Sequence, residues 1–124
     1  MSNSEGYITY LSRRVVDFLW TMVYNMFVEY KVVQTEEFRN WRANLKDLRA
    51  QTKIRLRIER ASIGNFGDWK TESGEVKAMR LHYGPGYRLY YVVRSGKIIF
   101  LLCGGGKSTQ AADIKKAIAL AKDV

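Results

Sequence analysis

Residues 75–103, EVKAMRLHYGPGYRLYYVVRSGKIIFLLC, consist of three β-rich stretches separated by two short turns. The turns are Gly84-Pro85-Gly86 and Ser95-Gly96, and glycine and proline interrupt regular structure most strongly. The expected strands are residues 75–83, 86–94 and 97–103. The last of them is apolar throughout after its first residue, which is typical of a central strand covered on both faces. This region therefore predicts a meander of at least three antiparallel strands.

The region before the meander has the pattern of two helices that follow a short β-rich stretch, residues 28–34. Thr35, Glu36 and Glu37 provide an N-cap hydroxyl and two acids that favour the positive end of a helix dipole. Apolar residues then recur at spacings of three and four in two different phases, which two helices joined near Asp47 explain better than one. The first set is Phe38, Trp41, Leu45 and Leu48, and the second is Ala50, Ile54, Ile58 and Ala61.

The C-terminal segment completes a single α+β domain. After Gly104-Gly105-Gly106, residues 110–124 place Ile114, Ile118 and Ala121 on one helical face. We therefore expect a terminal helix that closes the domain. A chain of 124 residues has the usual length of one domain, and 47% of its residues are hydrophobic, which is enough for one core.

The chain is strongly basic, with 21 Lys and Arg against 12 Asp and Glu and a net charge of +9. Such an excess sets up a long-range positive potential and indicates a polyanionic partner. The one cysteine, Cys103, cannot form an internal disulfide, and its apolar neighbours indicate a buried residue and a cytoplasmic protein. With one cysteine and one histidine, His82, we expect no metal site and no cofactor.

Residues 1–27 are expected to be an N-terminal extension, and residues 28–124 the folded domain. Residues 15–28, VVDFLWTMVYNMFV, are apolar but fall short of the roughly 20 residues that span a bilayer. No small-residue cleavage site follows them, so a signal peptide and a membrane partner are not expected. The extension is interpreted as a docked helix or as the product of a start assigned too early, since Met26 would serve equally well.

The hairpin of the first two meander strands has two different faces. If the odd-numbered residues pack on the helices, the even face carries cations, a phenol and an imidazole. Antiparallel pairing about the Gly84-Pro85-Gly86 turn then brings Arg80 and His82 across from Arg88 and Tyr90, within roughly 5 to 8 Å. These four residues are the candidate catalytic group.

Basic residues surround this group in the sequence. Six Lys or Arg and no acid lie between Glu75 and Asp113, so we expect a surface that lacks counter-ions and suits the phosphates and unstacked bases of single-stranded RNA. The candidate RNA-binding residues are Lys53, Arg57, Arg60, Lys70, Lys77, Arg94 and Lys107. The alternatives are a scattered basic sheet face, a solvated helix face and a surface histidine without a catalytic role.

Five motifs together resemble the phage-type, HigB-like "addiction module killer" branch of the RelE/ParE toxins. The match runs from about Val28 to the C-terminus, and the string from Gly84 to Asp113 is its most specific part. The motifs are Phe38-x-x-Trp41 with Leu45-Lys46-Asp47; Arg55-x-Arg57-Ile58-x-Arg60; Gly64-Asn65-x-Gly67-Asp68-x-Lys70; Arg80-Leu81-His82-Tyr83-Gly84-Pro85-Gly86-Tyr87-Arg88; and Leu101-Leu102-Cys103-Gly104-Gly105-x-Lys107-Ser108-x-Gln110-x-x-Asp113-Ile114.

The resemblance implies a RelE-like, microbial RNase-like fold, with two N-terminal helices packed on a curved, mainly antiparallel sheet and a C-terminal helix. It implies a type II toxin that acts as an mRNA interferase on message in the ribosomal A site. It also implies a cognate antitoxin, commonly of the helix-turn-helix type. Arg88 and Tyr90 match positions that contact RNA or assist cleavage, and Arg80 and Lys107 match basic positions nearby. Gly106 and Lys77 depart from the pattern, which has acids there.

In the expected mechanism a 2′-hydroxyl attacks the adjacent phosphorus, Arg80 and Arg88 stabilise the phosphorane, and Tyr90 or His82 transfers protons. A free phenol is mostly protonated at pH 7, so Tyr90 would need cationic neighbours that lower its pKa. Two alternatives stay open. A ParE-like gyrase poison would share the fold and depend most on the terminal helix, and a non-catalytic RNA- or antitoxin-binding module would need no proton-transfer group.

Overall fold

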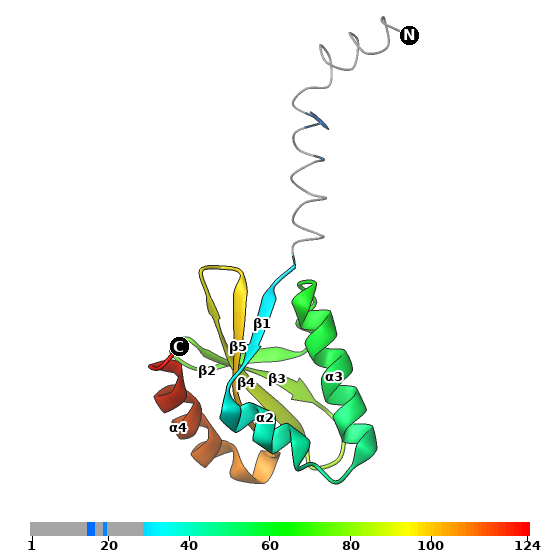
Figure 1. Cartoon of the computed structure of the whole chain (residues 1–124), viewed down its shortest axis with the longest axis vertical. Coiled ribbons are helices and arrows are strands. Elements are labelled where there is room, and N and C mark those ends of the chain that lie inside the picture. Colours follow the sequence, from blue (N-terminus) through cyan, green and yellow to red (C-terminus); the bar gives the residue numbers. More distant parts are fainter. Residues whose placement is uncertain (1–14, 17–18, 20–28) are drawn as a thin grey trace, which may run out of the picture.

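The computed structural model describes residues 15–16, 19 and 29–124, so the expected N-terminal extension lies mostly outside the described residues. The described domain is α+β, with a mixed sheet in the strand order β1-β5-β4-β3-β2 (Figure 1). The strands are β1 (Lys31–Gln34), β2 (Trp69–Ser73), β3 (Val76–Leu81), β4 (Tyr87–Arg94) and β5 (Ile98–Gly105). The helices are α2 (Glu36–Ala43), α3 (Leu48–Ser62) and α4 (Gln110–Ala121), and a 3₁₀ turn, η1 (Lys107–Thr109), precedes α4.

The expected meander is confirmed as β3, β4 and β5, which pair antiparallel in chain order. β5 lies inside the sheet and is buried along most of its length, as its apolar sequence predicts. Two edge strands extend the sheet: β2 pairs antiparallel with β3, and β1 pairs parallel with β5. The resemblance implied two N-terminal helices before the sheet, and that order was wrong, because β1 comes first in the chain, within the β-rich stretch 28–34.

The two helices before the meander begin where their caps predict. The hydroxyl of Thr35 accepts a hydrogen bond from the backbone N–H of Phe38 at 3.0 Å, which caps α2. The carboxylate of Asp47 accepts from the N–H groups of Arg49 and Ala50, at 2.9 and 3.2 Å, and caps α3. Each cap satisfies backbone donors that a helix leaves open at its first turn. The predicted junction near Asp47 is confirmed.

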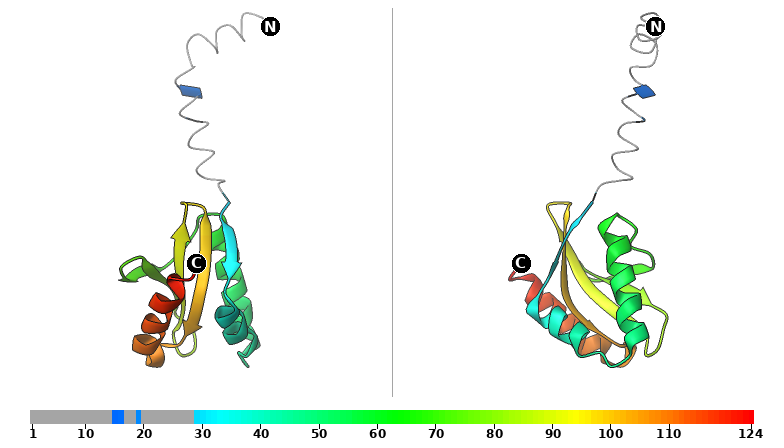
Figure 2. Two further views of the ribbon diagram at one scale, coloured as in Figure 1. Left: turned by 60° about the vertical axis from the view of Figure 1, so that its left-hand side comes forward. Right: turned by 45° about the vertical axis from the view of Figure 1, so that its right-hand side comes forward.

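The sheet is covered on both faces (Figure 2). Odd-numbered residues of β3 and β4, such as Met79 and Leu89, pack with α2 and α3. This confirms the odd face of the hairpin as a core face. Even-numbered residues, such as Ala78 and Val92, pack under Ala117 of α4, so the even face is not the open surface that the hairpin pattern predicted.

Cys103 is buried, as its apolar neighbours predict, and burial raises the pKa of its thiol to about 12. Within residues 15–16, 19 and 29–124, none of the helices has the length and apolar character needed to cross a bilayer.

Candidate active site

Two arginines face each other at the end of the sheet where α4 begins. Arg80 of β3 and Arg88 of β4 are paired in register, so their side chains leave the same face of neighbouring strands. Both are half-buried, and the Nε atom of each is buried without a hydrogen-bond partner among the residues that the structure describes. Two arginines at paired positions on neighbouring strands are a candidate site for an anion such as a phosphate group.

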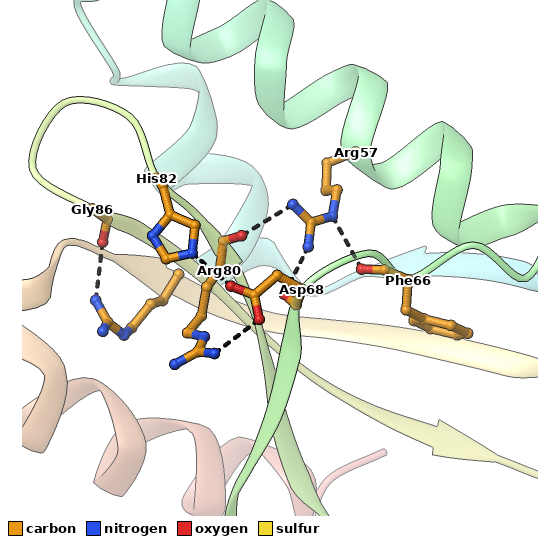
Figure 3. Close-up of polar contacts among 7 residues, drawn as sticks. Arg57, Phe66, Asp68, Arg80, His82 and Gly86 are labelled. Carbon is orange, nitrogen blue, oxygen red and sulfur yellow. Dashed lines mark hydrogen bonds and ion pairs between the residues drawn. The ribbon is translucent and has the colours of Figure 1, made fainter.

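Asp68 connects Arg80 to His82 (Figure 3). Its Oδ1 accepts a hydrogen bond from Arg80 Nη2 at 2.8 Å, and its Oδ2 lies 2.6 Å from His82 Nε2. The hydrogen bond from Arg80, followed by that from His82, lowers the pKa of Asp68. An ionised carboxylate only accepts, so Nε2 carries the proton, and Nδ1 of a neutral ring is left as an acceptor. With 78% of its side chain exposed, His82 can present Nδ1 to a substrate.

Arg57 holds the turn that carries Asp68. Its guanidinium donates to the carbonyl oxygens of Phe66, Asp68 and Arg80, at 3.0, 2.7 and 3.0 Å (Figure 3). Burial lowers the pKa of Arg57. Gly67 adopts φ +64°, and a Cβ there would meet the Arg57 guanidinium at 2.7 Å, so glycine allows this close approach. These carbonyl oxygens take three of the five N–H donors of Arg57, so the residue holds this turn, and its binding to RNA stays a prediction.

Tyr90 is fully buried under α4, and its hydroxyl has no hydrogen-bond partner in the described part of the chain. Burial, followed by the nearby charge of Asp113, raises the pKa of Tyr90 to about 12. The expectation of an accessible phenol was therefore wrong. The charge of Arg88 acts in the lowering direction, but it is outweighed by burial.

Glu72 adds a carboxylate that the sequence did not predict. It lies at a β-bulge between Thr71 and Ser73, which breaks the strand alternation used to assign faces. Its Oε1 is buried without a partner among the described residues, and its Oε2 lies 3.5 Å from the side-chain amide of Gln110 on α4. The charge of Glu72 raises the pKa of both Arg80 and Tyr90, so Glu72 lies near these two residues.

The loop between β5 and α4 brings Lys107 to this end of the sheet. The N–H of Lys107 donates to the carbonyl of Pro85 at 3.1 Å, so the lysine lies beside the turn that precedes Arg88. Gly105 lets Asp113 approach the strand closely, since a Cβ there would collide with the Asp113 carboxylate. Asp113 in turn accepts a hydrogen bond from the Thr109 hydroxyl at 2.6 Å.

Three of the predicted RNA-binding residues lie beside His82. Lys53, Arg57 and Arg60 line an open groove of about 240 Å³ together with His82, and Lys53 and Arg60 are exposed. The Lys53 ammonium lies 5.0 Å from the centre of the Tyr83 ring. Lys70 is exposed on β2, across from Ala78 on the even face.

Lys77 and Arg94 lie away from the cluster. Lys77 is on the odd face, where its ammonium is 5.8 Å from the centre of the Trp69 ring. Arg94 ends β4 and forms two hydrogen bonds with Glu75, at 2.6 and 3.0 Å. Asp68 and Glu75 thus supply the counter-ions that this surface was expected to lack.

The fold and the cluster define an α+β protein with a basic, partly desolvated site at one end of its sheet. No family model matches the chain. It is 44% identical over 94 residues to an uncharacterized protein of Haemophilus influenzae (strain ATCC 51907 / DSM 11121 / KW20 / Rd), a match that covers 76% of this chain and 95% of that protein. The chain belongs to the same family as that protein.

Proposed function

We propose that this protein is the toxin of a type II toxin-antitoxin pair, a RelE-like endoribonuclease that acts in the cytoplasm on mRNA in the ribosomal A site. The observation that carries the proposal is that Asp68 binds both Arg80 and His82, while Arg88 is paired in register with Arg80. This arrangement combines two cations for a phosphate with an exposed, oriented imidazole. The basic charge and the resemblance of the motifs support RNA as the substrate.

In this proposal the scissile phosphate lies against Arg80 and Arg88, which stabilise the charge that develops on the phosphorane. His82 accepts the proton of the 2′-hydroxyl at Nδ1, because Asp68 holds the ring through Nε2. The 2′-oxygen forms a bond to phosphorus, and the bond from phosphorus to the 5′-oxygen breaks. The products are a 2′,3′-cyclic phosphate and a 5′-hydroxyl, whose proton comes from water. This chemistry requires no metal ion.

The buried phenol of Tyr90 has a different role from the one that its sequence position indicates. A pKa of about 12 makes it a poor proton acceptor at neutral pH. Its hydroxyl is buried under α4 and out of reach of a bound phosphate, so the role of Tyr90 is to pack the strand that carries Arg88.

Induced expression in a bacterial host tests the proposal. Rapid loss of protein synthesis without a DNA-damage response is the expected result. A DNA-damage response that precedes the fall in protein synthesis would indicate a gyrase poison instead. Unimpaired growth would indicate a non-catalytic binding module.

A further inference from the structure

Arg57 of α3 joins three segments that are far apart in the sequence. Its Nε donates to the carbonyl oxygen of Phe66 at 3.0 Å, its Nη2 to that of Asp68 at 2.7 Å, and its Nη1 to that of Arg80 at 3.0 Å (Figure 3). The donors of a guanidinium lie in one plane in a fixed fork geometry, so they also fix the acceptors relative to one another. Arg57 therefore holds α3, the turn before β2 and the end of β3 in one arrangement.

This contact lies where the pairing of β2 with β3 ends. The outermost pair in the register is Trp69 with Met79, so Asp68 and Arg80 come directly after it. The N–H of Arg80 donates to the carbonyl oxygen of Asp68 at 2.8 Å, and Arg57 donates to the carbonyl oxygens of both residues. One guanidinium thus extends the pairing of the two strands by one further pair of residues.

That further pair carries side chains of the candidate site. Asp68 accepts from Arg80 through Oδ1 at 2.8 Å, and its Oδ2 lies 2.6 Å from His82 Nε2. Hydrogen bonds weaken steeply outside a narrow range of distance and angle. The Asp68 carboxylate can therefore bind both partners only while its backbone stays at this position, which Arg57 sets.

Burial separates Arg57 from the other cations of the groove beside His82. Lys53 and Arg60 line the same groove and are exposed, whereas Arg57 is half-buried. Exposed cations are available to a phosphate backbone. The donors of Arg57 that bind the three carbonyl oxygens are already used within the protein, which favours a role in holding the site.

We propose that Arg57 is a positioning residue of the cleavage site, which acts through Asp68 by holding its carboxylate where it binds both Arg80 and His82. Its effect on catalysis rests on the proposed function, but the placement of Asp68 can be measured without RNA. A small displacement of a catalytic group lowers the rate strongly. A change at Arg57 should therefore lower kcat and leave KM for the message unchanged.

Arg57→Lys tests the proposal, with Arg55→Lys as the matched control on the same helix. Lysine keeps the charge but lacks the planar fork that reaches three carbonyl oxygens. Arg55 is 51% exposed and lies 2.9 Å from Glu59. On purified ribosomes, Arg57→Lys should lower kcat about 10- to 100-fold at constant KM, and Arg55→Lys should match the parent. Combining Arg57→Lys with Asp68→Asn should cost no more than Asp68→Asn alone, because both changes act on one carboxylate.

NMR of the free protein measures the placement of Asp68 directly. In the parent, hydrogen bonds from Arg80 and then His82 lower the pKa of Asp68. In Arg57→Lys this pKa should rise toward that of an unfolded aspartate, about 4. The backbone N–H of Arg80 should also exchange with solvent at least about tenfold faster, because its acceptor on Asp68 is no longer fixed.

Gly67→Ala is a second variant, which keeps Arg57 and its charge. Gly67 has φ +64°, and a Cβ there would come within 2.7 Å of the guanidinium, so the alanine displaces Arg57 from the turn. The fall in kcat and the rise in the pKa of Asp68 should both be reproduced. The domain should stay folded, because Gly67 is exposed and Phe66 remains stacked on Tyr91 with 5.5 Å between ring centres.

Three outcomes would overturn the proposal or part of it. An unchanged pKa of Asp68 and unchanged exchange of the Arg80 N–H in both variants reject the positioning role. A rise in KM at constant kcat in Arg57→Lys, with parent behaviour in Gly67→Ala, assigns Arg57 to direct contact with RNA. If the parent cuts no message but both variants raise the pKa of Asp68, the proposed function is rejected and Arg57 is retained as the residue that places Asp68.

Discussion

Arg88 and Arg94 lie on the same face of β4, six residues apart, and differ in what their guanidinium groups contact. Arg94 is bound to Glu75 and donates to the carbonyl oxygens of Ala121 and Val124, at 2.9 and 3.3 Å. Arg88 donates to the carbonyl of Gly86 at 3.1 Å, and its Nε is buried without a partner among the described residues. The first arginine fastens the C-terminal segment to the sheet. Among the residues that the structure describes, the guanidinium of Arg88 forms one hydrogen bond, so it has terminal N–H donors left for a ligand.

The largest expected effect follows from Arg88→Ala. Removing a guanidinium that stabilises the phosphorane should lower the cleavage rate about 10²- to 10³-fold, which abolishes growth arrest. The fold should remain, because Arg88 is half-buried and outside both hydrophobic cores. Cleavage of a reporter message and circular dichroism on the same preparation check both points. An unfolded Arg88→Ala protein would mean that the residue is structural, like Arg94.

Asp68→Asn tests whether the imidazole of His82 takes part in cleavage. The amide cannot orient the imidazole as the carboxylate does, so cleavage should fall by about 10- to 100-fold. The stability of the parent should also depend on pH through this residue. The pKa of Asp68 is lowered in the folded protein, so its contribution is present above the pKa of an unfolded aspartate, about 4, and is lost as the pH falls further.

Urea denaturation at several pH values measures that dependence. The difference in midpoint between the parent and Asp68→Asn should shrink as the pH falls below about 4. A difference that grows below about pH 4 would contradict the assigned ion pairs.

Arg94→Ala should lower stability and leave cleavage unchanged, which is the reverse of the effect expected for Arg88→Ala. Its loss removes the ion pair with Glu75 and the hydrogen bonds to the end of α4, which together should cost about 1 to 3 kcal/mol of unfolding free energy. Cleavage by the folded fraction should equal that of the parent, because Arg94 lies roughly 20 Å along β4 from Arg88. Thermal unfolding and cleavage at a temperature where both proteins are folded separate these effects. If Arg94→Ala lost cleavage but kept the stability of the parent, the active site would have to include Arg94 on β4.

Tyr90→Phe has the smallest expected effect. The Tyr90 hydroxyl is buried without a partner among the described residues, so its removal should leave stability unchanged or raise it by up to about 1 kcal/mol. Cleavage should weaken by no more than about tenfold, since Phe keeps the buried ring and the lost hydroxyl does not reach the phosphate. Equilibrium denaturation and RNA binding check this. A large loss of stability would show that the hydroxyl has a partner.

The elements of this fold were largely predictable from local patterns. Apolar periodicity predicted α3, α4 and the three meander strands, and Asp47 marked the junction between helices because its side chain caps α3. The parallel pairing of β1 with β5 was not predictable in the same way, since it depends on contacts between residues far apart in the chain.

The candidate site was predictable only in part. The alternation along β3 and β4 identified Arg80 and Arg88 as neighbours, and the register confirms this. The burial of Tyr90 was missed because α4 covers that face, a tertiary contact that strand alternation does not predict. Asp68 and Glu72 were missed because one precedes a strand and the other occupies a bulge, where the two-residue period fails.

The most direct test of the central claim is the mapping of message ends in a reconstituted translation reaction that contains ribosomes. The account predicts new ends that carry a 2′,3′-cyclic phosphate and a 5′-hydroxyl with the parent and with Arg94→Ala, and none with Arg88→Ala. Equal cutting by Arg88→Ala and the parent, or intact message in a reaction where the parent stops translation, would contradict it.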